Sequence, residues 1–474
     1  MRRTKIVCTL GPAVDDPKML EKLILSGMDI ARINLSHGNH EEHLKRIVSL
    51  RMLSMKFNRY IPIMLDTKGP EIRVGHFENG FINLIEGEQF ILTSSSVVGN
   101  QERVSITYPL LPNELTKGDR IFLDDGLLEL DVLRIDANDI VCKVISGGHL
   151  STKKAVNIPG KHLNLPSLSD VDKRDIIFAI ENDIEIIAPS FVRSASDISD
   201  LREFLAENNV KKKILIVAKI ENLEGMQNVK AILEVSDGIM VARGDMGVEL
   251  PAEDVPIMQK QIIGLCRNAG KPVITATQML DSMIRNPHPT RAEVSDVANA
   301  VLDGTDAIML SGETAAGKHP IEALITMAKV AERAETSDVF TDNIMAFKKM
   351  IATNNVTDVI GHATVQIATE LNASAIITST QSGTTARMVA KYRPRTPIVA
   401  VTVSTYTASQ LNLFWGVTPL AARASKDTDD MIDMAVNSAK EASLVKCNDT
   451  VVITAGVPVG IPGTTNIIKV HEVK

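Results

Sequence analysis

The sequence is poor in cysteine and contains no long apolar run. Its four cysteines, Cys8, Cys142, Cys266 and Cys447, lie far apart and form no Cys-x-x-Cys pair. This argues against a structural zinc site or a disulfide framework, and free thiols are typical of a reducing cytoplasm. No stretch approaches the roughly 18 uncharged apolar residues of a membrane span, and the first apolar run is too short for a signal-peptide core. We therefore expect a cytoplasmic protein without a membrane span.

The chain also lacks an excess of positive charge. Its 474 residues include 51 Lys plus Arg and 58 Asp plus Glu, which gives a net charge of −7. Because nucleic acids are bound by basic surfaces, this balance argues against nucleic acid as the main partner. A small anionic substrate is still compatible, since a local basic cluster can lie on an acidic protein. The length suggests about three domains, or fewer if one is a barrel.

Eight short apolar runs, rich in Ile and Val, are separated mostly by segments with helical patterning. The runs are Lys5–Leu10, Asp29–Leu35, Ile61–Asp66, Ile184–Pro189, Ile214–Ile220, Gly238–Val241, Pro272–Thr277 and Ala307–Leu310. Helices are expected at Pro17–Leu25, Glu41–Phe57 and Val255–Asn268, among others. Runs of this kind are typical of strands buried on both faces of a parallel sheet, and eight β/α units favour a closed (β/α)8 TIM barrel. The alternative is an open doubly wound sheet, but no Gly-x-Gly-x-x-Gly fingerprint opens a helix.

Between the third and fourth runs the apolar pattern changes to period two. Strands are expected at Glu88–Thr93, Arg103–Tyr108, Arg120–Leu123, Leu127–Ile135 and Ile140–Ser146. We interpret residues 70–167 as a small β-barrel domain inserted after the third barrel strand. It would emerge at the face where barrel active sites lie, and could therefore act as a lid.

The last region, residues 343–474, again alternates strands and helices. The strands are Ala375–Thr380, Pro397–Thr402 and Thr450–Ala455, and the helices are Thr357–Leu371, Thr384–Lys391 and Asp427–Leu444. This predicts a separate C-terminal α/β domain, which leaves residues 1–69 and 168–342 to the barrel. Two Gly-rich turns, Gln381–Thr385 and Gly460–Thr465, could form a pair of anion-binding loops.

Polar and charged residues gather where the predicted barrel strands end. Alternation places Arg32, Asn34 and Ser36 on one face of the second strand, over about 13 Å. Lys219 and Glu221, about 7 Å apart on one face, are either a weak salt bridge or a cation beside a metal ligand. Polar and charged residues are expected to gather at one rim of a barrel only where that rim, at the C-terminal ends of the strands, is the active site.

These side chains also indicate the kind of substrate. Asp245 brings a second carboxylate close to Glu221, and Mg²⁺ is commonly bound by one or two protein carboxylates plus water and substrate oxygens. The fixed positive charges of the rim favour a strongly anionic, phosphorylated and carboxylated small molecule. Phosphoryl transfer consists mostly of positioning and charge neutralisation. The segment Gly312–Lys318 matches most of a phosphate-loop pattern, but His319 replaces the required hydroxyl, so any nucleotide must bind in another mode.

Taken together, the motifs closely resemble the pyruvate kinase family, through all three regions of the chain. The segments concerned are Ala31–Gly38, Leu65–Arg73, Lys219–Gly225, Val241–Glu249, Ala276–Asp281 and Asn286–Gly317. The resemblance implies the same three-part fold and transfer of the phosphoryl group of phosphoenolpyruvate to ADP, giving pyruvate and ATP in glycolysis. It also implies Mg²⁺ (or Mn²⁺) and K⁺ as cofactors and a homotetramer. We expect no extra C-terminal domain of the kind that some bacterial members carry.

The resemblance further implies a role for each matching residue. Catalysis would involve Lys219, Arg32 and Thr277, and the substrate would be bound by Arg32, Lys219, Gly244, Asp245 and Thr277. The nucleotide would be bound by Asn34, His37, Arg73 and Lys154, the last reaching it from the inserted domain. Mg²⁺ would be held by Glu221 and Asp245, and K⁺ by Asn34, Ser36, Asp66 and Thr67. Glu71 matches the members that depend on K⁺, since those independent of it carry a lysine there.

The turn Thr380–Thr385 resembles the family's effector-phosphate loop. The implied effector contacts are Thr380, Ser382, Gly383, Thr384 and Thr385. Some sugar-bisphosphate-activated members have a lysine where Thr384 lies, so the effector stays open between a phosphorylated sugar and a nucleotide. An inert surface turn is the alternative.

Two other functions are alternatives to phosphoryl transfer. A metal-dependent lyase or aldolase acting on pyruvate-like acids could use similar carboxylates on a similar barrel, but the inserted domain and Arg73 argue against it. A regulatory protein that keeps only the effector site is disfavoured because the set of strand-end residues is intact.

Overall fold

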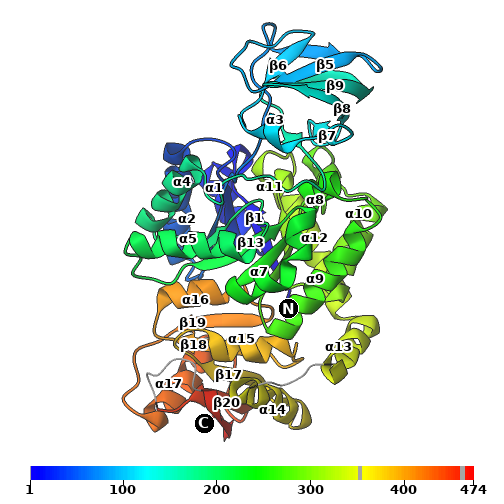
Figure 1. The fold of residues 1–474 in the computed structure, drawn as a ribbon. Coiled ribbons are helices and arrows are strands. Elements are labelled where there is room, and N and C mark those ends of the chain that lie inside the picture. The colour runs from blue at the N-terminus through cyan, green and yellow to red at the C-terminus, as the bar shows by residue number, and fades with distance from the viewer. Residues whose placement is uncertain (1, 351–354, 459–464) are drawn as a thin grey trace.

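The structure is a computed structural model, and it describes residues 2–350, 355–458 and 465–474. Three parts follow one another along its long axis, as Figure 1 shows. The barrel lies in the middle, the inserted β domain stands at one end of it and the C-terminal domain at the other. Within the described residues no helix is both long enough and apolar enough to cross a membrane.

The central part is a closed barrel of eight parallel strands. In barrel order the strands are β1 (Lys5–Thr9), β2 (Ile30–Asn34), β3 (Ile63–Asp66), β12 (Ile186–Ala188), β13 (Leu215–Ile220), β14 (Gly238–Ala242), β15 (Val273–Ala276) and β16 (Ala307–Leu310). Closure is made by β1 and β16, which pair in parallel from Lys5↔Ala307 to Cys8↔Leu310. The eight predicted strands and the closed barrel are therefore confirmed, and the open sheet is excluded.

Helices surround the barrel or follow its strand ends, and the last of them, Asp338–Met350, packs on two other helices rather than on the strands. They are α1 (Pro17–Leu25), α2 (His40–Lys56), α4 (Asp170–Glu181), α5 (Ala195–Glu207), α6 (Leu223–Gln227), α7 (Val229–Val235), α8 (Arg243–Glu249), α9 (Val255–Ala269), α10 (Arg291–Asp303), α11 (Gly312–Ala315), α12 (Pro320–Glu335) and α13 (Asp338–Met350). Local chemistry sets their ends. Thr290 and Glu293 form a capping box at the start of α10, and Gly304, at φ 95°, ends it in the left-handed conformation.

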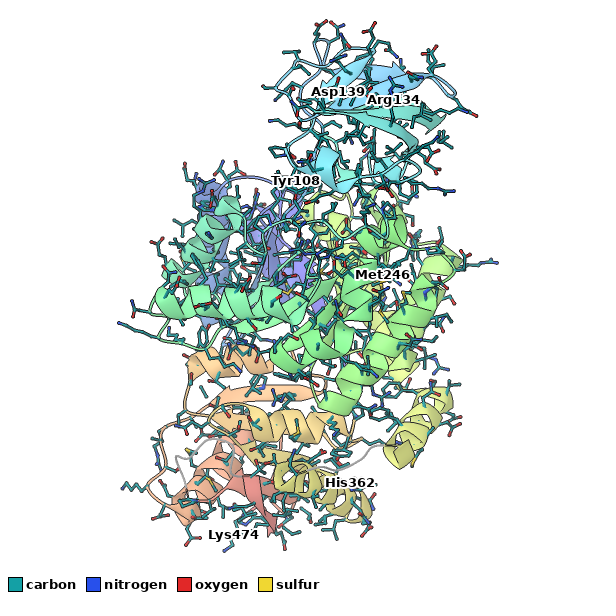
Figure 2. The ribbon with its side chains drawn as sticks, viewed as in Figure 1. Tyr108, Arg134, Asp139, Met246, His362 and Lys474 are labelled. Atoms are coloured by element: carbon teal, nitrogen blue, oxygen red, sulfur yellow. The ribbon has the colours of Figure 1, made fainter. Side chains whose placement is uncertain are left out.

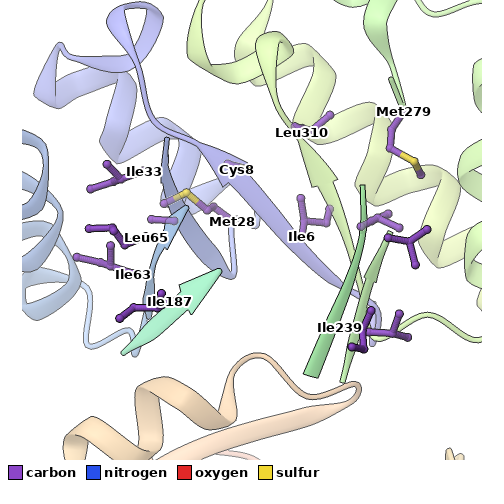
Figure 3. Close-up of a cluster of buried hydrophobic side chains, with 14 of the residues drawn as sticks. Ile6, Cys8, Met28, Ile33, Ile63, Leu65, Ile187, Ile239, Met279 and Leu310 are labelled. Carbon is purple, nitrogen blue, oxygen red and sulfur yellow. The ribbon is translucent and has the colours of Figure 1, made fainter. Parts of the chain in front are cut away.

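Two apolar layers result from the alternation of side chains along the strands. Outward-pointing residues such as Ile33, Leu65 and Ile187 pack in the layer between strands and helices (Figure 3). Inward-pointing residues such as Val217 and Met240 fill the barrel interior. Burial of one such side chain contributes about 1.5–3 kcal/mol. The same alternation aims the polar residues at the strand ends into the mouth of the barrel.

The inserted domain is built on a mixed half-barrel sheet of six strands. In sheet order these are β11 (Val156–Asn157), β7 (Arg120–Leu123), β8 (Leu128–Asp136), β9 (Asp139–Ser146), β5 (Gln89–Thr93) and β6 (Arg103–Ser105). A separate pair is formed by β4 (Phe81–Leu84) and β10 (Gly148–Ser151), and the domain's one helix is α3 (Leu111–Glu114). The five predicted strands are confirmed, although β6 ends at Ser105 rather than Tyr108. The pattern did not predict β4, β10 and β11, which have only two to four residues each.

The C-terminal part is a five-stranded sheet covered by helices. Its strand order is β19 (Val417–Ala421), β18 (Ile398–Thr402), β17 (Ala375–Ser379), β20 (Thr450–Gly456) and β21 (Thr465–Glu472), and only the β20–β21 pair is antiparallel. The helices are α14 (Val356–Glu370), α15 (Thr384–Lys391), α16 (Thr405–Leu411) and α17 (Thr428–Glu441). The predicted α/β domain is confirmed, while β19, β21 and α16 were not predicted.

The C-terminal domain is joined to the barrel by buried contacts. Leu413, just after α16, is fully buried among the residues that fill the barrel interior. The guanidinium of Arg393 donates to Asp306 Oδ1 at 2.8 Å, and both side chains are buried. The end of the barrel opposite the inserted domain is therefore closed by another domain.

Candidate active site

Four buried charged side chains form one network at the mouth of the barrel. Asp66, at the end of β3, accepts from Arg32 Nε at 2.7 Å and from Lys219 Nζ at 2.9 Å. Lys219 Nζ also lies 2.9 Å from Glu221 Oε1. Their exposed fractions are 7% for Arg32, 1% for Asp66, 8% for Lys219 and 0% for Glu221. Charges so deeply buried are costly unless paired, and here each cation contacts at least one carboxylate.

The barrel strands place these groups by simple alternation. Arg32 follows Ile30 on the inward face of β2, and Lys219 follows Val217 on the inward face of β13. Parallel pairing sets Asn34 opposite Asp66 at the ends of β2 and β3. Arg32 also donates to Thr9 Oγ1 at the end of β1, at 2.9 Å. Four neighbouring or facing strands thus contribute to one cluster.

The network keeps two fixed positive charges at the barrel mouth. Burial would lower the pKa of Lys219, but the carboxylates of Asp66 and Glu221 outweigh burial and raise it above its ordinary value. Burial would likewise raise the pKa of Asp66, but Arg32 and Lys219 hold it below the usual range. Lys219 therefore stays protonated and Asp66 ionised at neutral pH, which suits an anionic substrate.

The carboxylates of Glu221 and Asp245 are less well compensated. Burial raises the pKa of Glu221 to about 7; the charge of Lys219 opposes this rise and that of Asp245 adds to it. Glu221 Oε1 is buried without a hydrogen bond, although its ion-pair partner Lys219 is close. Burial also raises the pKa of Asp245, whose side chain makes no hydrogen bond or ion pair within the described part of the chain. Excess negative charge on two oxygen ligands fits a divalent cation such as Mg²⁺.

Thr277 and Gly244 meet on the far side of the mouth. The N–H of Gly244 donates to Thr277 Oγ1 at 2.7 Å. Thr277 has φ 68°, a conformation that β-branched residues rarely adopt. Arg243 holds it there, because its guanidinium donates to the Thr277 carbonyl at 2.8 Å and to Asp296 at 2.7 Å. Strain that is held by surrounding contacts is common at functional sites.

The second strand ends earlier than its sequence pattern predicts. β2 stops at Asn34, whose side-chain carbonyl accepts from the Ser36 N–H at 3.1 Å and turns the chain. Ser36 is therefore in a turn and not on the face shared by Arg32 and Asn34, and both Ser36 and His37 are exposed. Thr67 is buried beside the network, with its hydroxyl accepting from the Ser190 N–H at 3.2 Å.

The residues expected from the inserted domain and its linker lie apart from the network. Arg73 pairs with Glu71 at 2.7 Å and donates to the Lys153 carbonyl at 2.6 Å. Lys154 pairs with Asp124 of the inserted domain itself, at 2.7 Å. Figure 2 shows Tyr108 where this domain meets the barrel and Met246 on the barrel below. Arg73 therefore contacts the segment that carries Lys154, through the carbonyl of Lys153. Lys154 itself lies against Asp124 and is not brought to Lys219.

The predicted effector loop lies in the other end domain, next to the start of α15. Thr380 Oγ1 accepts from the Gly383 N–H at 3.0 Å, and the hydroxyls of Ser382 and Thr384 lie 3.0 Å apart. Thr385 Oγ1 lies 2.7 Å from the hydroxyl of Thr465. The second predicted turn, Gly460–Thr465, lies outside the described residues except for Thr465.

Two groups in the network were not found from the sequence. Ser190, which follows β12, accepts from Lys219 Nζ at 2.6 Å, and its hydroxyl lies 2.7 Å from the Thr67 carbonyl and 3.2 Å from Asp66 Oδ1. The N–H of Phe191 donates to Glu221 Oε2 at 2.6 Å. The only signal was that Ser190 directly follows the predicted strand Ile184–Pro189, as polar residues follow the other predicted strands. In the phosphate-loop-like segment, buried Glu313 accepts from the N–H groups of Ser311 and Leu280, which is a structural role.

A closed barrel whose mouth gathers buried cations beside two buried carboxylates is the arrangement of an enzyme site for an anionic small molecule. The sequence profile of the pyruvate kinase barrel domain matches residues 1–324, and that of the pyruvate kinase alpha/beta domain matches residues 358–471. The chain belongs to the pyruvate kinase family and is a phosphotransferase.

Relatives that match this chain over its whole length agree with this assignment. The chain is 51% identical over 474 residues to a pyruvate kinase of Geobacillus stearothermophilus, covering all of this chain and 80% of that protein. It is 50% identical over 475 residues to one of Staphylococcus haemolyticus, covering 81% of that protein. A crystal structure of a pyruvate kinase from Cryptosporidium parvum superposes with a TM-score of 0.94 at 40% identity, covering 100% of this chain and 96% of that one.

Proposed function

We propose that the chain transfers the phosphoryl group of phosphoenolpyruvate to ADP, with Lys219 and Arg32 as the cations that bind and stabilise it. The carrying observation is the buried network in which these two cations share Asp66. In the reaction the bond between phosphorus and the enol oxygen breaks and a bond to the terminal ADP oxygen forms. Fixed positive charge in a site of low dielectric constant is the main source of stabilisation for such a step.

The substrate carboxylate is assigned to the Gly244–Thr277 side of the mouth, with Asp245 beside it. Support comes from the hydrogen bond that orders Thr277 against Gly244 and from the strained φ of Thr277. On this assignment Thr277 would lie near the carbon that takes up a proton when the enolate becomes pyruvate.

The nucleotide is assigned to Asn34, His37, Arg73 and Lys154. Arg73 and Lys154 both lie in or next to the inserted domain, and Lys154 has an exposed fraction of 39% on its side chain. For Lys154 to reach a nucleotide, its pair with Asp124 must open. Closure of the inserted domain as a lid would supply that change and exclude water.

Glu221 and Asp245 are proposed to bind Mg²⁺ or Mn²⁺, and Asn34, Ser36, Asp66 and Thr67 to bind K⁺. The first assignment is supported by the buried, undercompensated carboxylates described above. The second is supported by the pairing of Asn34 with Asp66, which gathers oxygen atoms at neighbouring strand ends. When bound, these cations would neutralise charge on the phosphoryl group as it moves.

Regulation, assembly and domain limits complete the proposal. Thr380, Ser382, Gly383, Thr384 and Thr385 would bind a phosphorylated sugar or nucleotide effector of a homotetramer. The proposed domains are residues 1–69 and 168–342 for catalysis, 70–167 for the lid and 343–474 for regulation. The four cysteines are all free thiols, in keeping with a cytoplasmic location.

One assay tests the proposed reaction. The purified protein is incubated with phosphoenolpyruvate, ADP, Mg²⁺ and K⁺, and pyruvate and ATP are measured independently. Equal amounts of both products, dependent on ADP, are expected. Pyruvate formed without ATP would overturn the assignment and favour a hydrolase or lyase.

A further inference from the structure

Five cations line one small cavity where the C-terminal domain meets the barrel. They are Arg267 and Lys271 from the barrel, and Arg387, Lys391 and Arg393 from the C-terminal domain. The one carboxylate that lines the cavity, among the described residues, is that of Asp306, just before β16. This is the end of the barrel away from the inserted domain, and in Figure 1 helix α15 lies directly beneath it. The cavity is therefore surrounded by far more positive than negative charge.

The ion pairs in this group leave most of the positive charge uncompensated. Arg393 pairs with Asp306 at 2.8 Å, and Lys391 pairs with Asp358 at 2.9 Å. The third cation, Lys271, donates to main-chain carbonyls at the end of α7. The two remaining cations, the arginines of α9 and α15, form no ion pair within the described part of the chain. Charges at a buried junction are costly unless they are paired.

Guanidinium nitrogens without a hydrogen-bond acceptor are concentrated at this cavity. Ten buried side-chain nitrogen and oxygen atoms of the described residues have no hydrogen-bond partner, and four of these ten belong to the three arginines. The four atoms are Nε and Nη2 of Arg267, Nε of Arg387 and Nε of Arg393. A buried charged donor has lost its water without gaining another acceptor. Four such donors around one cavity indicate an acceptor that the described residues do not supply.

Two of these guanidinium groups lie against the same glycine. Arg393 donates to the Gly304 carbonyl at 2.8 Å. A Cβ atom on Gly304 would lie 2.7 Å from Nη1 of Arg267, so this second guanidinium also rests on the glycine. Burial lowers the pKa of Arg267, and the positive charge of Arg393 lowers it further. An anion beside both groups would replace this repulsion by attraction.

We propose that the cavity binds one small monovalent anion, chloride, held by the guanidinium groups of Arg267, Arg387 and Arg393. The cavity offers about 10 Å³, close to the smallest volume that holds one water molecule. It therefore takes a single ion and is too small for a phosphate ester or a nucleotide. Chloride is slightly larger than water, and the long arginine side chains can move by the small amount that it requires. Charged N–H donors are the groups that bind such an ion most strongly.

The ion would connect two domains and would not take part in the reaction at the barrel mouth. Arg267 belongs to the barrel, whereas Arg387 and Arg393 belong to the C-terminal domain. None of the residues assigned to the effector loop lines this cavity. The expected effect of chloride is therefore on the stability of the junction between the domains, and it can be measured without substrate, metal or effector.

The chain's one tryptophan provides a local signal for this junction. Trp415 is buried, and the guanidinium groups of Arg3 and Arg393 lie over its ring, at 5.4 and 5.1 Å from the centroid. Its fluorescence is followed during thermal unfolding of the full-length protein, in mixtures of potassium chloride and potassium gluconate at constant total concentration. The cation and the ionic strength then stay the same, and only the size of the anion changes.

We expect the midpoint of the Trp415 transition to rise as chloride replaces gluconate, which is too large for the cavity. A ligand that binds only the folded state lowers the unfolding equilibrium constant about 100-fold when its concentration is 100 times its Kd. The midpoint should therefore rise with the logarithm of the chloride concentration. The same midpoint in chloride and in gluconate would overturn the proposal.

Two variants test whether the arginines are responsible. Arg267→Met and Arg387→Met each remove one cation from the cavity, and in each the rise produced by chloride should fall to less than half of that in the wild type. Arg174→Met is the matched control, because Arg174 is exposed on α4 and does not line the cavity. It should keep the full response to chloride. A wild-type response in both cavity variants would refute the assignment.

Bromide can locate the ion directly and needs no variant, so the proposal stays testable even if both cavity variants fail to fold. Wild-type crystals grown in potassium bromide should give a peak of anomalous scattering beside the Nε atoms of Arg267, Arg387 and Arg393. Bromide peaks found only at other places on the protein would mean adventitious binding only, and would also overturn the proposal.

Discussion

Replacement of Lys219 by methionine tests the proposed mechanism most directly. Methionine fills a similar volume in this buried position but removes the cation that contacts Asp66, Glu221 and Ser190. Loss of one preorganised group that stabilises transition-state charge costs about 10²–10³ in turnover, or about 2.7–4 kcal/mol. Because Lys219 is 8% exposed, solvent screens its charge little, so we expect a loss of kcat at the upper end of this range, about 10³-fold.

The assay must separate this loss from a change in metal binding. Lys219 opposes the rise in the pKa of Glu221, which is about 7, so its removal will raise that pKa further and leave more Glu221 protonated at neutral pH. The kcat is therefore measured by coupled formation of pyruvate at about pH 8.5 and saturating Mg²⁺, where Glu221 is ionised to a greater extent. Binding of Mn²⁺, followed by electron paramagnetic resonance, should persist in the variant.

Lys211→Met serves as the control, since it removes the same charge from an exposed position before β13. It should leave kcat unchanged. Turnover of Lys219→Met within tenfold of wild type, at saturating substrate and metal, would refute the role assigned to this lysine. So would an equal loss in both variants.

Four further predictions use other parts of the structure. Glu221→Gln should raise the Mg²⁺ concentration for half-maximal activity tenfold or more, because it removes one of two carboxylate ligands; an unchanged Mg²⁺ titration would contradict the metal assignment. Activity in tetramethylammonium buffer should be a small fraction of that in K⁺, and full activity there would refute the K⁺ site. Arg393→Met removes the ion-pair partner of buried Asp306, which keeps only the hydrogen bonds from the N–H groups of Val273 and Trp415, and should lower the free energy of unfolding by about 3–5 kcal/mol, seen as a lower urea midpoint; an unchanged midpoint would show the pair to be dispensable. Burial raises the thiol pKa of three cysteines, which keeps them protonated, so iodoacetamide at about pH 8 should modify only the exposed Cys447 in the native protein, as mass spectrometry can show. The protected thiols are Cys8, Cys142 and Cys266.

The barrel was predictable because its strands are buried on both faces. Each of the eight runs is apolar at nearly every position, and short runs of this kind are typical of strands in a covered parallel sheet. The strands missed in the inserted domain are different, because β11 has two residues and β4 alternates exposed and buried positions over only four. Such short pieces gain their stability from pairing with distant strands, which a local pattern does not record.

The charged residues of the proposed site could be predicted from the sequence, but most of the contacts between side chains could not. Lys219 and Glu221 were expected on one face of a strand, and the structure joins them in an ion pair. The pairing of Lys154 with Asp124 was not expected, because it depends on how two turns of the inserted domain fold together. Ser190 was missed since a single serine after a strand is common, and only its position between Lys219 and Asp66 shows its part in the network.

Closure of the barrel by β1 and β16 has a consequence for how the chain is made. Thr9 ends the first strand, but the last strand, which pairs with it, ends at Leu310. At about 5–20 residues per second, synthesis of the intervening chain takes roughly 15–60 s, during which one edge of β1 has no partner. Exposed strand edges promote aggregation, so the nascent chain needs protection over this interval. Because the proposed site also needs Lys219 beside Asp66 and Thr277 beside Gly244, enzyme activity will appear only once most of the barrel has left the ribosome.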